Sequence, residues 1–407
     1  MKIDIARLKN NLLSLSEFGY KEGKGITRAA FTPEYNQGKE FTRNLMIESG
    51  LQVWEDSLGN LFGRLGGASD KPTIMVGSHL DTVPQGGIFD GALGVLGGIE
   101  AVKTMVEAGY SNDHPVEICA FTAEEGSSLG GTLGSRAVAG KVQLSESERE
   151  GLDQLGLSET AITSANRYQE LVNSKCYLEL HVEQGPSLWT DKLDIGIVSA
   201  VAGIRRYQIT VTGEANHAGT TPMDLRKDAL LTGSELILKI NKVVQEIGGN
   251  LVGTVGDIKV TPGATNIIPG QVSFPLELRD NDPKALDKAV SRIQELLTEQ
   301  SSDGCNCTIS ELITKKEVSL NTDVQENIEA ACRDLGYSYR YMISGAGHDA
   351  TIMSQLMPTG MIFIPSVNGI SHSPEEWSEW EDIEKGVNTL LHSIIKLDSN
   401  KSSAINI

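Results

Sequence analysis

Residues 73–126 decide the fold of this chain: TIMVGSHLDTVPQGGIFDGALGVLGGIEAVKTMVEAGYSNDHPVEICAFTAEEG. The runs TIMVGSH and VEICAFTA are short, apolar and rich in β-branched residues, which predicts two buried strands. Between them, GALGVLGGIEAVKTMVEAG has the pattern of a helix. Strand, crossover helix and strand together indicate a largely parallel sheet with helices on both faces. In such a sheet, functional side chains gather just past the carboxyl ends of the strands.

The rest of the chain shows two different patterns of predicted helices and strands. Helices are expected near residues 3–17 and over 32–49, where a proline suits the first helical turn. From Arg206 the order becomes strand, helix, two strands, helix and one more strand, which predicts a small α/β sandwich. The helix from Thr322 onward is expected to return to the first domain.

The length of the chain agrees with two domains, because 407 residues exceed what one hydrophobic core usually supports. We therefore predict an α/β fold. A doubly wound, mostly parallel sheet forms the catalytic domain, and a smaller α/β sandwich is inserted in it as a lid. The predicted bounds are 1–205 and 319–407 for the catalytic domain and 206–318 for the lid.

The composition excludes several classes of protein. Hydrophobic residues at 39% and charged residues at 22% argue against a disordered or fibrous chain. The net charge of -19, without any Lys/Arg cluster, argues against a nucleic-acid partner. No run approaches eighteen uninterrupted apolar residues, so no membrane span is expected.

The N-terminus and the cysteines favour a cytoplasmic location. The first residues carry charges throughout and predict an amphipathic helix rather than a secretion signal. Five scattered cysteines do not resemble a disulfide framework. Cys305 and Cys307 lack a second pair, so a surface turn is favoured there over a zinc site.

The most informative motif is GSHLDTVPQGGIFDG, in which a strand ends in His79-Leu80-Asp81 and Asp90 follows in a glycine-rich loop. Histidine and aspartate are suitable metal ligands. Strand geometry repeats every two residues, so His79 and Asp81 are expected to point to the same side, where the Asp81 carboxylate would orient the imidazole. A polar strand end without a metal remains the alternative for this motif alone.

Adjacent carboxylates, Glu124 and Glu125, end the second strand. One of them can bind a metal while its neighbour handles protons. Metal-assisted hydrolysis needs an acceptor for the proton of the attacking water, and Glu124 is the candidate. The alternative is a solvated Glu pair favoured by a helix dipole.

Two further apolar strands deliver histidines: His181 in CYLELHVEQG and His372 after GMIFIPSVNG. Either histidine alone would more often be an ordinary polar residue, but ligands after successive strands are hard to reach by chance. Five ligands are too many for one tetrahedral zinc and suit two ions that share one carboxylate. Asp90 is the expected bridge. The predicted ligands are His79, Asp90, Glu125, His181 and His372.

These segments together resemble the hydantoinase/carbamoylase family of amidases, within the superfamily of di-zinc aminoacylases and exopeptidases. The resemblance spans nearly the whole chain. The matching motifs are GSHLDTVPQGGIFDG, AEEGS, LELHVEQGP, NHAGTTPM, TNIIPG, LELRD, SGAGHDA and GISHSPEE, in the family's order. The family likeness implies that His79, Asp90 and His181 hold one metal, that Asp90, Glu125 and His372 hold the other, and that Glu124 is the general base.

The resemblance also implies substrate contacts. Gln184 would contact a ureido group, while His217 and Asn266 in the lid would hold the substrate near its carbonyl. Arg279 would grip a carboxylate, for which a planar guanidinium is suited. Gly345 and Gly347 would let backbone approach the substrate, with His348 and Asp349 structural. The alternatives are that His217 caps a turn, that Asn266 lies in a loop because of its turn preference, and that Arg279 is a solvated strand residue.

The likeness implies a homodimer through the lid, in which lid residues complete the neighbouring subunit's site. One departure is that Ser127, Ser128 and Leu129 stand where the family often has a small residue, arginine and phenylalanine. Because this segment is next to the site, substrate preference could differ.

Three functions remain open. The first is hydrolysis of a ureido acid, either an N-carbamoyl-L-amino acid or allantoate in purine catabolism, with release of ammonia and carbon dioxide. The second is an aminoacylase or dipeptidase, which His181 in place of an acidic residue and Gln184 both disfavour. The third is a catalytically silent binding protein, which the intact ligand set disfavours. Zinc is the expected ion, and manganese, cobalt and nickel also accept such ligands.

Overall fold

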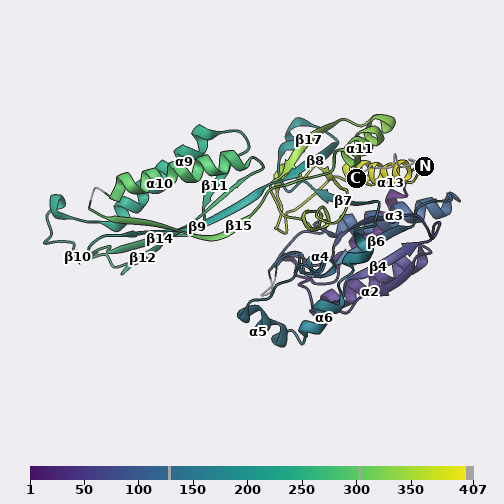
Figure 1. The fold of residues 1–407 in the computed structure, drawn as a ribbon, viewed down its shortest axis with the longest axis horizontal. Coiled ribbons are helices and arrows are strands. Elements are labelled where there is room, and N and C mark those ends of the chain that lie inside the picture. Colours follow the sequence, from purple (N-terminus) through teal and green to yellow (C-terminus); the bar gives the residue numbers. More distant parts are fainter. Residues whose placement is uncertain (127–129, 302–303, 400–407) are drawn as a thin grey trace. The chain divides into compact units, whose positions relative to one another are not determined.

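The chain is described here by a computed structural model that covers residues 1–126, 130–301 and 304–399, apart from the side chains of 147–148 and 153–154. It divides into two compact units (Figure 1). The first unit consists of Met1–Ser199 and Leu320–Ile407, and the second of Ala200–Ser319. The second unit begins six residues before the predicted lid at 206 and ends one residue after it.

The first unit is built on a nine-stranded sheet in the order β16-β8-β18-β7-β5-β6-β4-β3, with β17 beside β8. The four central strands β18, β7, β5 and β6 are parallel, whereas the flanking pairs are antiparallel. The prediction of an α/β fold with a mostly parallel central sheet is confirmed. The strands are β3 (Gln52–Glu55), β4 (Leu61–Leu65), β5 (Ile74–His79), β6 (Val116–Phe121), β7 (Cys176–Val182), β8 (Ile195–Val201), β16 (Val318–Ser319), β17 (Tyr339–Ser344) and β18 (Thr359–Ile364).

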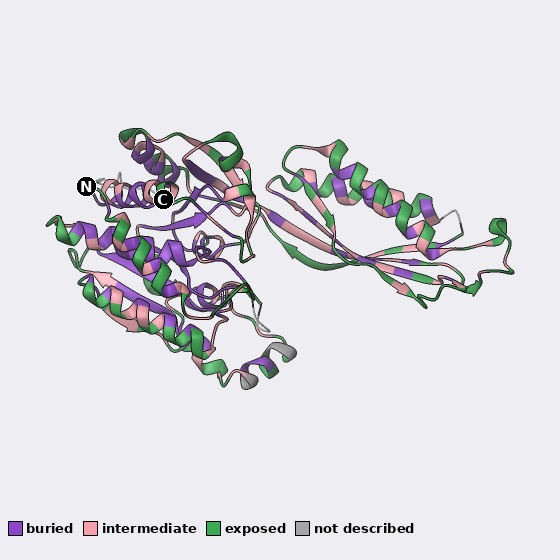
Figure 2. Cartoon of the chain, turned by 180° about the vertical axis from the view of Figure 1, so that it is seen from behind, coloured by how far each residue is buried: buried purple, intermediate pink, exposed green. Residues whose placement is uncertain are grey.

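The four central strands are buried at every position, so side chains on both faces of the sheet are covered (Figure 2). Helices α3 and α13 pack against these strands and against each other. Among the remaining helices, Thr32 caps α2 through its side chain, and Pro33 is its first residue, as the sequence predicts. The helices are α1 (Ile5–Ser16), α2 (Pro33–Glu48), α3 (Ala92–Glu107), α4 (Leu133–Val138), α5 (Glu146–Gln154), α6 (Glu159–Ser164), α7 (Tyr168–Leu171), α8 (Ser187–Asp191), α11 (Thr322–Leu335), α12 (Asp349–Met353) and α13 (Trp380–Ser399).

The second unit contains a five-stranded antiparallel sheet, in the order β11-β14-β9-β15 with β12 beside β14, and a separate two-stranded sheet of β10 and β13. Its two α-helices, α9 and α10, cover the larger sheet, and the unit has its own hydrophobic core. Strand β14 alternates between buried and less buried residues, so one face of the sheet supplies the core. Helices α9 and α10 pack against each other and against this sheet. The elements are β9 (Gly203–Thr212), β10 (Asn216–His217), α9 (Ala229–Ile247), β11 (Val252–Val255), β12 (Lys259–Thr261), β13 (Ile267–Ile268), β14 (Gln271–Asp280), α10 (Pro283–Ser301) and β15 (Asn306–Lys315). A lid function for this unit stays a prediction.

All five cysteines are free thiols, and four of them are buried. The prediction of a surface turn at Cys305 and Cys307 is wrong, because Cys307 belongs to β15 and Cys305 lies within the core of the second unit. There Thr232 Oγ1 donates a hydrogen bond to the Cys305 sulfur at 3.4 Å. Among the helices of the described residues, none combines the length and the apolar character that crossing a bilayer requires.

Candidate metal centre and active site

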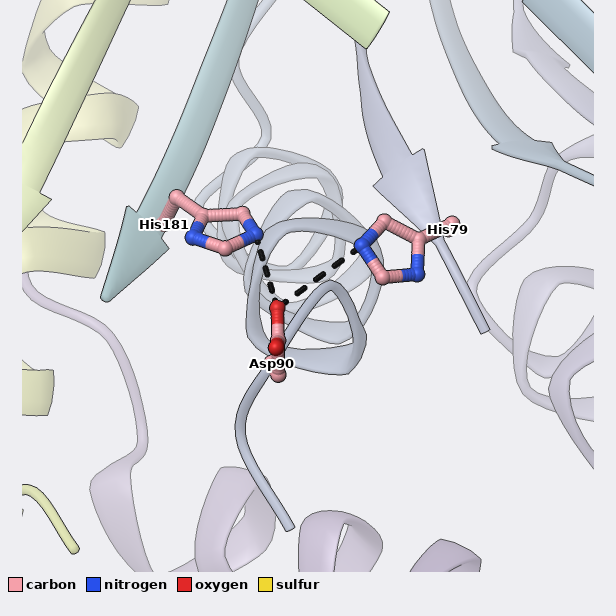
Figure 3. A group of neighbouring side chains, drawn as sticks. All are labelled: His79, Asp90 and His181. Atoms are coloured by element: carbon pink, nitrogen blue, oxygen red, sulfur yellow. Dashed lines mark ion pairs between the residues drawn. The ribbon is translucent and has the colours of Figure 1, made fainter. Parts of the chain in front are cut away.

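The first candidate ligand group lies at the carboxyl ends of two neighbouring parallel strands (Figure 3). His79 ends β5, His181 is the last residue but one of β7, and Asp90 lies in the loop before α3. Asp90 Oδ1 is 3.1 Å from His181 Nε2 and 3.8 Å from His79 Nε2. One carboxylate oxygen therefore faces both imidazoles.

The second group uses the other oxygen of the same carboxylate. His372 Nε2 is 3.3 Å from Asp90 Oδ2 and 3.6 Å from Glu125 Oε2. The three side chains could hold a metal ion. Asp90 thus presents one oxygen to each group, which is the geometry of a carboxylate that bridges two metals.

Two backbone carbonyls orient the buried imidazoles. His79 Nδ1 is 2.9 Å from the carbonyl oxygen of Asp81, and His181 Nδ1 is 3.0 Å from that of Val182. Because a carbonyl oxygen only accepts, each Nδ1 carries the proton. In the neutral imidazoles Nε2 then carries the lone pair, and each Nε2 faces Asp90, as metal ligation requires.

The prediction that the Asp81 carboxylate orients the His79 imidazole is wrong. Strand β5 ends at His79, so Asp81 lies beyond it, and its Oδ1 is 3.9 Å from His79 Nδ1. Its two oxygens instead accept hydrogen bonds from the backbone N–H groups of Glu124 at 3.2 Å and Glu125 at 3.0 Å. The carboxylate therefore holds the loop that carries the two glutamates, and only the main chain of Asp81 orients the imidazole.

Gly91 lets the Asp90 loop pass close to His79. Its φ is +64°, in the left-handed region that favours glycine. A Cβ at this position would lie 2.5 Å from His79 Nε2. Glycine is therefore required both by the backbone turn into α3 and by the neighbouring imidazole.

Carboxylates crowd this end of the sheet. Burial, followed by the charges of Asp349 and Glu125, raises the pKa of Glu124 well above its usual range. Burial and then Asp90 raise the pKa of Glu125 to about 10. Burial also opposes ionisation of Asp90, but His181 and His372 more than offset this and hold its pKa well below the usual range.

Divalent cations fit this arrangement. Glu125 Oε1 is a buried oxygen without a hydrogen-bond partner among the described residues. An orphaned carboxylate oxygen in a crowded acidic site is costly unless a cation neutralises it. Histidine and carboxylate are also the ligand types that zinc and related metals accept.

Gln184 lies at the second ligand group in a left-handed conformation, with φ +61°. Its Nε2 donates a hydrogen bond to Asp90 Oδ2 at 3.1 Å and lies 3.3 Å from His372 Nε2. Its Oε1 is buried and has no hydrogen-bond partner among the described residues. The Gln184 amide is therefore held beside Asp90 and His372, where it would have to lie to contact a substrate at the second ligand group.

The other predicted substrate residues lie apart from these ligands in the chain. His217 and Asn266 are neighbours in the second unit, where Ala218 N donates to the Asn266 carbonyl at 3.0 Å. Arg279, on β14, pairs with Glu277. In the first unit, a Cβ at Gly347 would meet nothing within 4 Å, so packing does not explain this glycine. Their contacts with substrate stay predictions, and Ser127–Leu129 lie outside the described residues.

Three buried acidic residues lie near the ligands; two of them, Glu179 and Glu376, have no role in the prediction from sequence, and the third, Asp349, was expected to be structural. Glu179 accepts hydrogen bonds from Ser78 Oγ and from Ala350 N, both at 2.8 Å. Together with His181 and His348 it forms a third group of atoms that could hold a metal. Asp349 accepts a hydrogen bond from Ser135 Oγ at 2.5 Å, and Glu376 contacts the Asp90 loop. A buried acidic residue within an apolar strand, as Glu179 is in CYLELHV, is the one sequence signal that could have marked such a position.

The fold and the site define a class of protein. A parallel α/β sheet with two ligand groups that share one aspartate at its carboxyl edge is an arrangement suited to two-metal hydrolysis. Residues 75–396 match Peptidase family M20/M25/M40. The chain therefore belongs to this family.

Individual relatives narrow the comparison. The N-carbamoyl-L-amino acid amidohydrolase of Geobacillus stearothermophilus is 40% identical over 96% of this chain and 98% of that protein. The allantoate amidohydrolase of Bacillus subtilis is 34% identical over 94% and 95%. A solved hydantoinase/carbamoylase family amidase from Burkholderia multivorans superimposes with a TM-score of 0.88 at 32% identity, over 98% of this chain and 99% of that one. The resemblance to the hydantoinase/carbamoylase amidases is confirmed.

Proposed function

We propose that this chain is a two-metal amidohydrolase that cleaves a linear ureido C–N bond in an N-carbamoyl-L-amino acid or in allantoate, with release of ammonia and carbon dioxide. The observation that carries the proposal is the Asp90 carboxylate. One of its oxygens faces His79 and His181, and the other faces His372. One relative is named for N-carbamoyl-L-amino acids and another for allantoate, and both names support a ureido C–N bond as the target.

Divalent ions at the two groups would polarise the scissile carbonyl and acidify the attacking water. Glu124 takes the proton of that water and returns it to the leaving nitrogen. Its Oε2 is 3.8 Å from His79 Nε2, beside the first group. Asp81 positions Glu124 through its backbone N–H. No side-chain nucleophile is needed, and the five thiols are free and mostly buried.

Substrate recognition is assigned to residues of both units. Gln184 would bind the ureido group from its position at the second ligand group. His217, Asn266 and Arg279 would bind the carbonyl and the carboxylate of the substrate, and the backbone at Gly347 would approach it closely.

We also propose that the protein is cytoplasmic and that it forms a homodimer through the second unit. Helix α9 buries one side against its own sheet but leaves Leu231 57% and Leu238 73% exposed. These leucines are seven residues apart, so they share one face of the helix. A second copy of this chain is the proposed cover for that face, and light scattering of the purified chain tests the oligomeric state.

The test of function is ammonia release by the metal-reconstituted chain. The substrates are allantoate, several N-carbamoyl-L-amino acids, N-carbamoyl-β-alanine and an N-acetyl amino acid, with acetate monitored alongside. A preference for one ureido acid supports the proposal and identifies the substrate. Acetate release without ureido turnover would make the chain an aminoacylase, and no turnover of any of them would favour a binding protein.

A further inference from the structure

Glu376 lies between two loops that carry proposed metal ligands. It is 3% exposed. Its Oε1 accepts hydrogen bonds from the backbone N–H of Phe89 at 3.2 Å and of Asp90 at 3.1 Å, although Asp90 is 286 residues away in sequence. Its Oε2 accepts a hydrogen bond from Ser371 Oγ at 2.8 Å. One side chain therefore joins the Asp90 loop to the residue that precedes His372.

The Asp90 loop is shaped to receive this carboxylate. A Cβ at Gly87 would lie 2.5 Å from Glu376 Cβ and 2.6 Å from its Cδ, closer than real Cβ atoms approach. Gly87 is not among the residues with positive φ, so its backbone would accept alanine. The close approach of Glu376 alone explains the glycine.

The His372 loop needs such an anchor. His372 has φ +53°, a left-handed conformation that persists in residues other than glycine only where the surroundings hold it. It lies outside the helices and strands, and its side chain is 51% exposed. Next to Glu376, Trp377 packs its ring against Phe89 with centroids 5.4 Å apart, which adds a second contact between the same two segments.

We propose that Glu376 is a positioning residue that sets the separation of Asp90 and His372 and so forms the second metal group. The proposal rests on the two-metal function. His79 and His181 are held by backbone carbonyls of their own segments, so they do not depend on the loop that carries His372. Loss of Glu376 therefore weakens the second metal more than the first.

The test is metal binding, measured without turnover. Chain stripped of metal by a chelator is titrated with Co²⁺, followed by visible absorption, and its Zn²⁺ content is measured by elemental analysis after equilibrium dialysis. Wild type is expected to bind two ions. Glu376→Ala should keep the affinity for the first ion and lose about 10–100-fold for the second, the range typical of partners that orient metal ligands.

Three further variants separate the contact from general damage. Glu376→Gln keeps an oxygen for the two N–H groups and an amide for Ser371, so it should retain both ions. Gly87→Ala displaces Glu376 without removing a ligand and should reproduce the selective loss, but it should add little when combined with Glu376→Ala. Glu375→Ala removes an exposed neighbouring carboxylate and should bind as wild type.

The outcomes are distinguishable. Two ions bound with wild-type affinity by Glu376→Ala and by Gly87→Ala, or equal weakening of both ions, would overturn the role of Glu376. If Glu376→Ala does not fold, Gly87→Ala alone decides. A wild-type chain that binds one ion or none would instead refute the two-metal function on which the inference depends.

Discussion

Replacement of Asp81 by asparagine tests whether its carboxylate acts on the glutamate loop or on His79. Asp81 is 2% exposed, and each of its oxygens accepts one backbone N–H, from Glu124 and from Glu125. Asparagine retains one acceptor oxygen and turns an NH₂ group toward the other N–H. One hydrogen bond to a charged group is therefore lost, at about 1.5–3 kcal/mol in the free energy of unfolding.

The same loss displaces Glu124, the proposed base. If the displacement is expressed fully in the transition state, kcat/KM falls by about 10–100-fold, since about 1.4 kcal/mol corresponds to a factor of ten. Metal binding at the first group should change little, because the main-chain carbonyl of Asp81 still orients His79. The measurements are urea unfolding, metal content and kcat/KM on the preferred ureido acid.

Asp56→Asn is the matched control. Asp56 Oδ1 also accepts backbone N–H groups, from Leu58, Gly59 and Asn60, in the turn between β3 and β4. Asp56 Oδ2 also accepts a hydrogen bond from Asn60 Nδ2 at 2.7 Å, which the NH₂ group of asparagine cannot accept. The variant therefore loses one hydrogen bond to a charged group, as Asp81→Asn does, and should lower stability comparably while kcat/KM stays unchanged. Loss of the first metal in Asp81→Asn, with the rate per bound metal preserved, would refute our assignment and restore the carboxylate as the partner of His79.

Three further predictions concern the site and the pH dependence of stability. Glu124→Gln should keep the fold and both metals while activity falls about 10²–10⁴-fold, and retained activity would remove Glu124 as base. Gly91→Ala should lower the free energy of unfolding by at least about 1–2 kcal/mol because of the left-handed φ alone. It should also weaken binding of the first metal, because the new Cβ would meet the His79 ring. Unchanged urea unfolding and unchanged metal affinity would contradict the packing argument. Burial raises the pKa of Asp382 to about 6, so the folded chain binds this proton more tightly than the unfolded chain and stability falls as the pH rises from about 4 to 6. Asp382→Asn, which remains neutral, should exceed wild type in unfolding free energy at pH 7.5 but not at pH 4.5, and equal differences at both pH values would contradict this.

Much of the first unit is predictable from local pattern. The apolar runs around His79 and after Asp113 form β5 and β6, and the intervening segment forms α3, because fully buried parallel strands and a buried helix leave continuous apolar stretches in the sequence. The antiparallel strands at the sheet edges were not predicted, since pairing direction depends on which strands become neighbours and leaves no mark in a single strand.

The candidate metal ligands could also be predicted from the sequence. His79, Asp90, Glu125, His181 and His372 each follow or end an apolar strand, and parallel strands bring their carboxyl ends to one edge of a sheet. Position along a strand thus indicated which side chains gather, without showing which atoms face one another.

Only the tertiary structure decided the atomic arrangement. That Asp90 turns one oxygen to each ligand group, that the Asp81 carboxylate serves the glutamate loop, and that Glu376 reaches the Asp90 loop all depend on loop conformations. These contacts join segments up to 287 residues apart, and the hydrogen bonds of a loop are set by the whole fold around it. Periodicity describes which face of a helix or strand is buried, and it carries no information about such bonds.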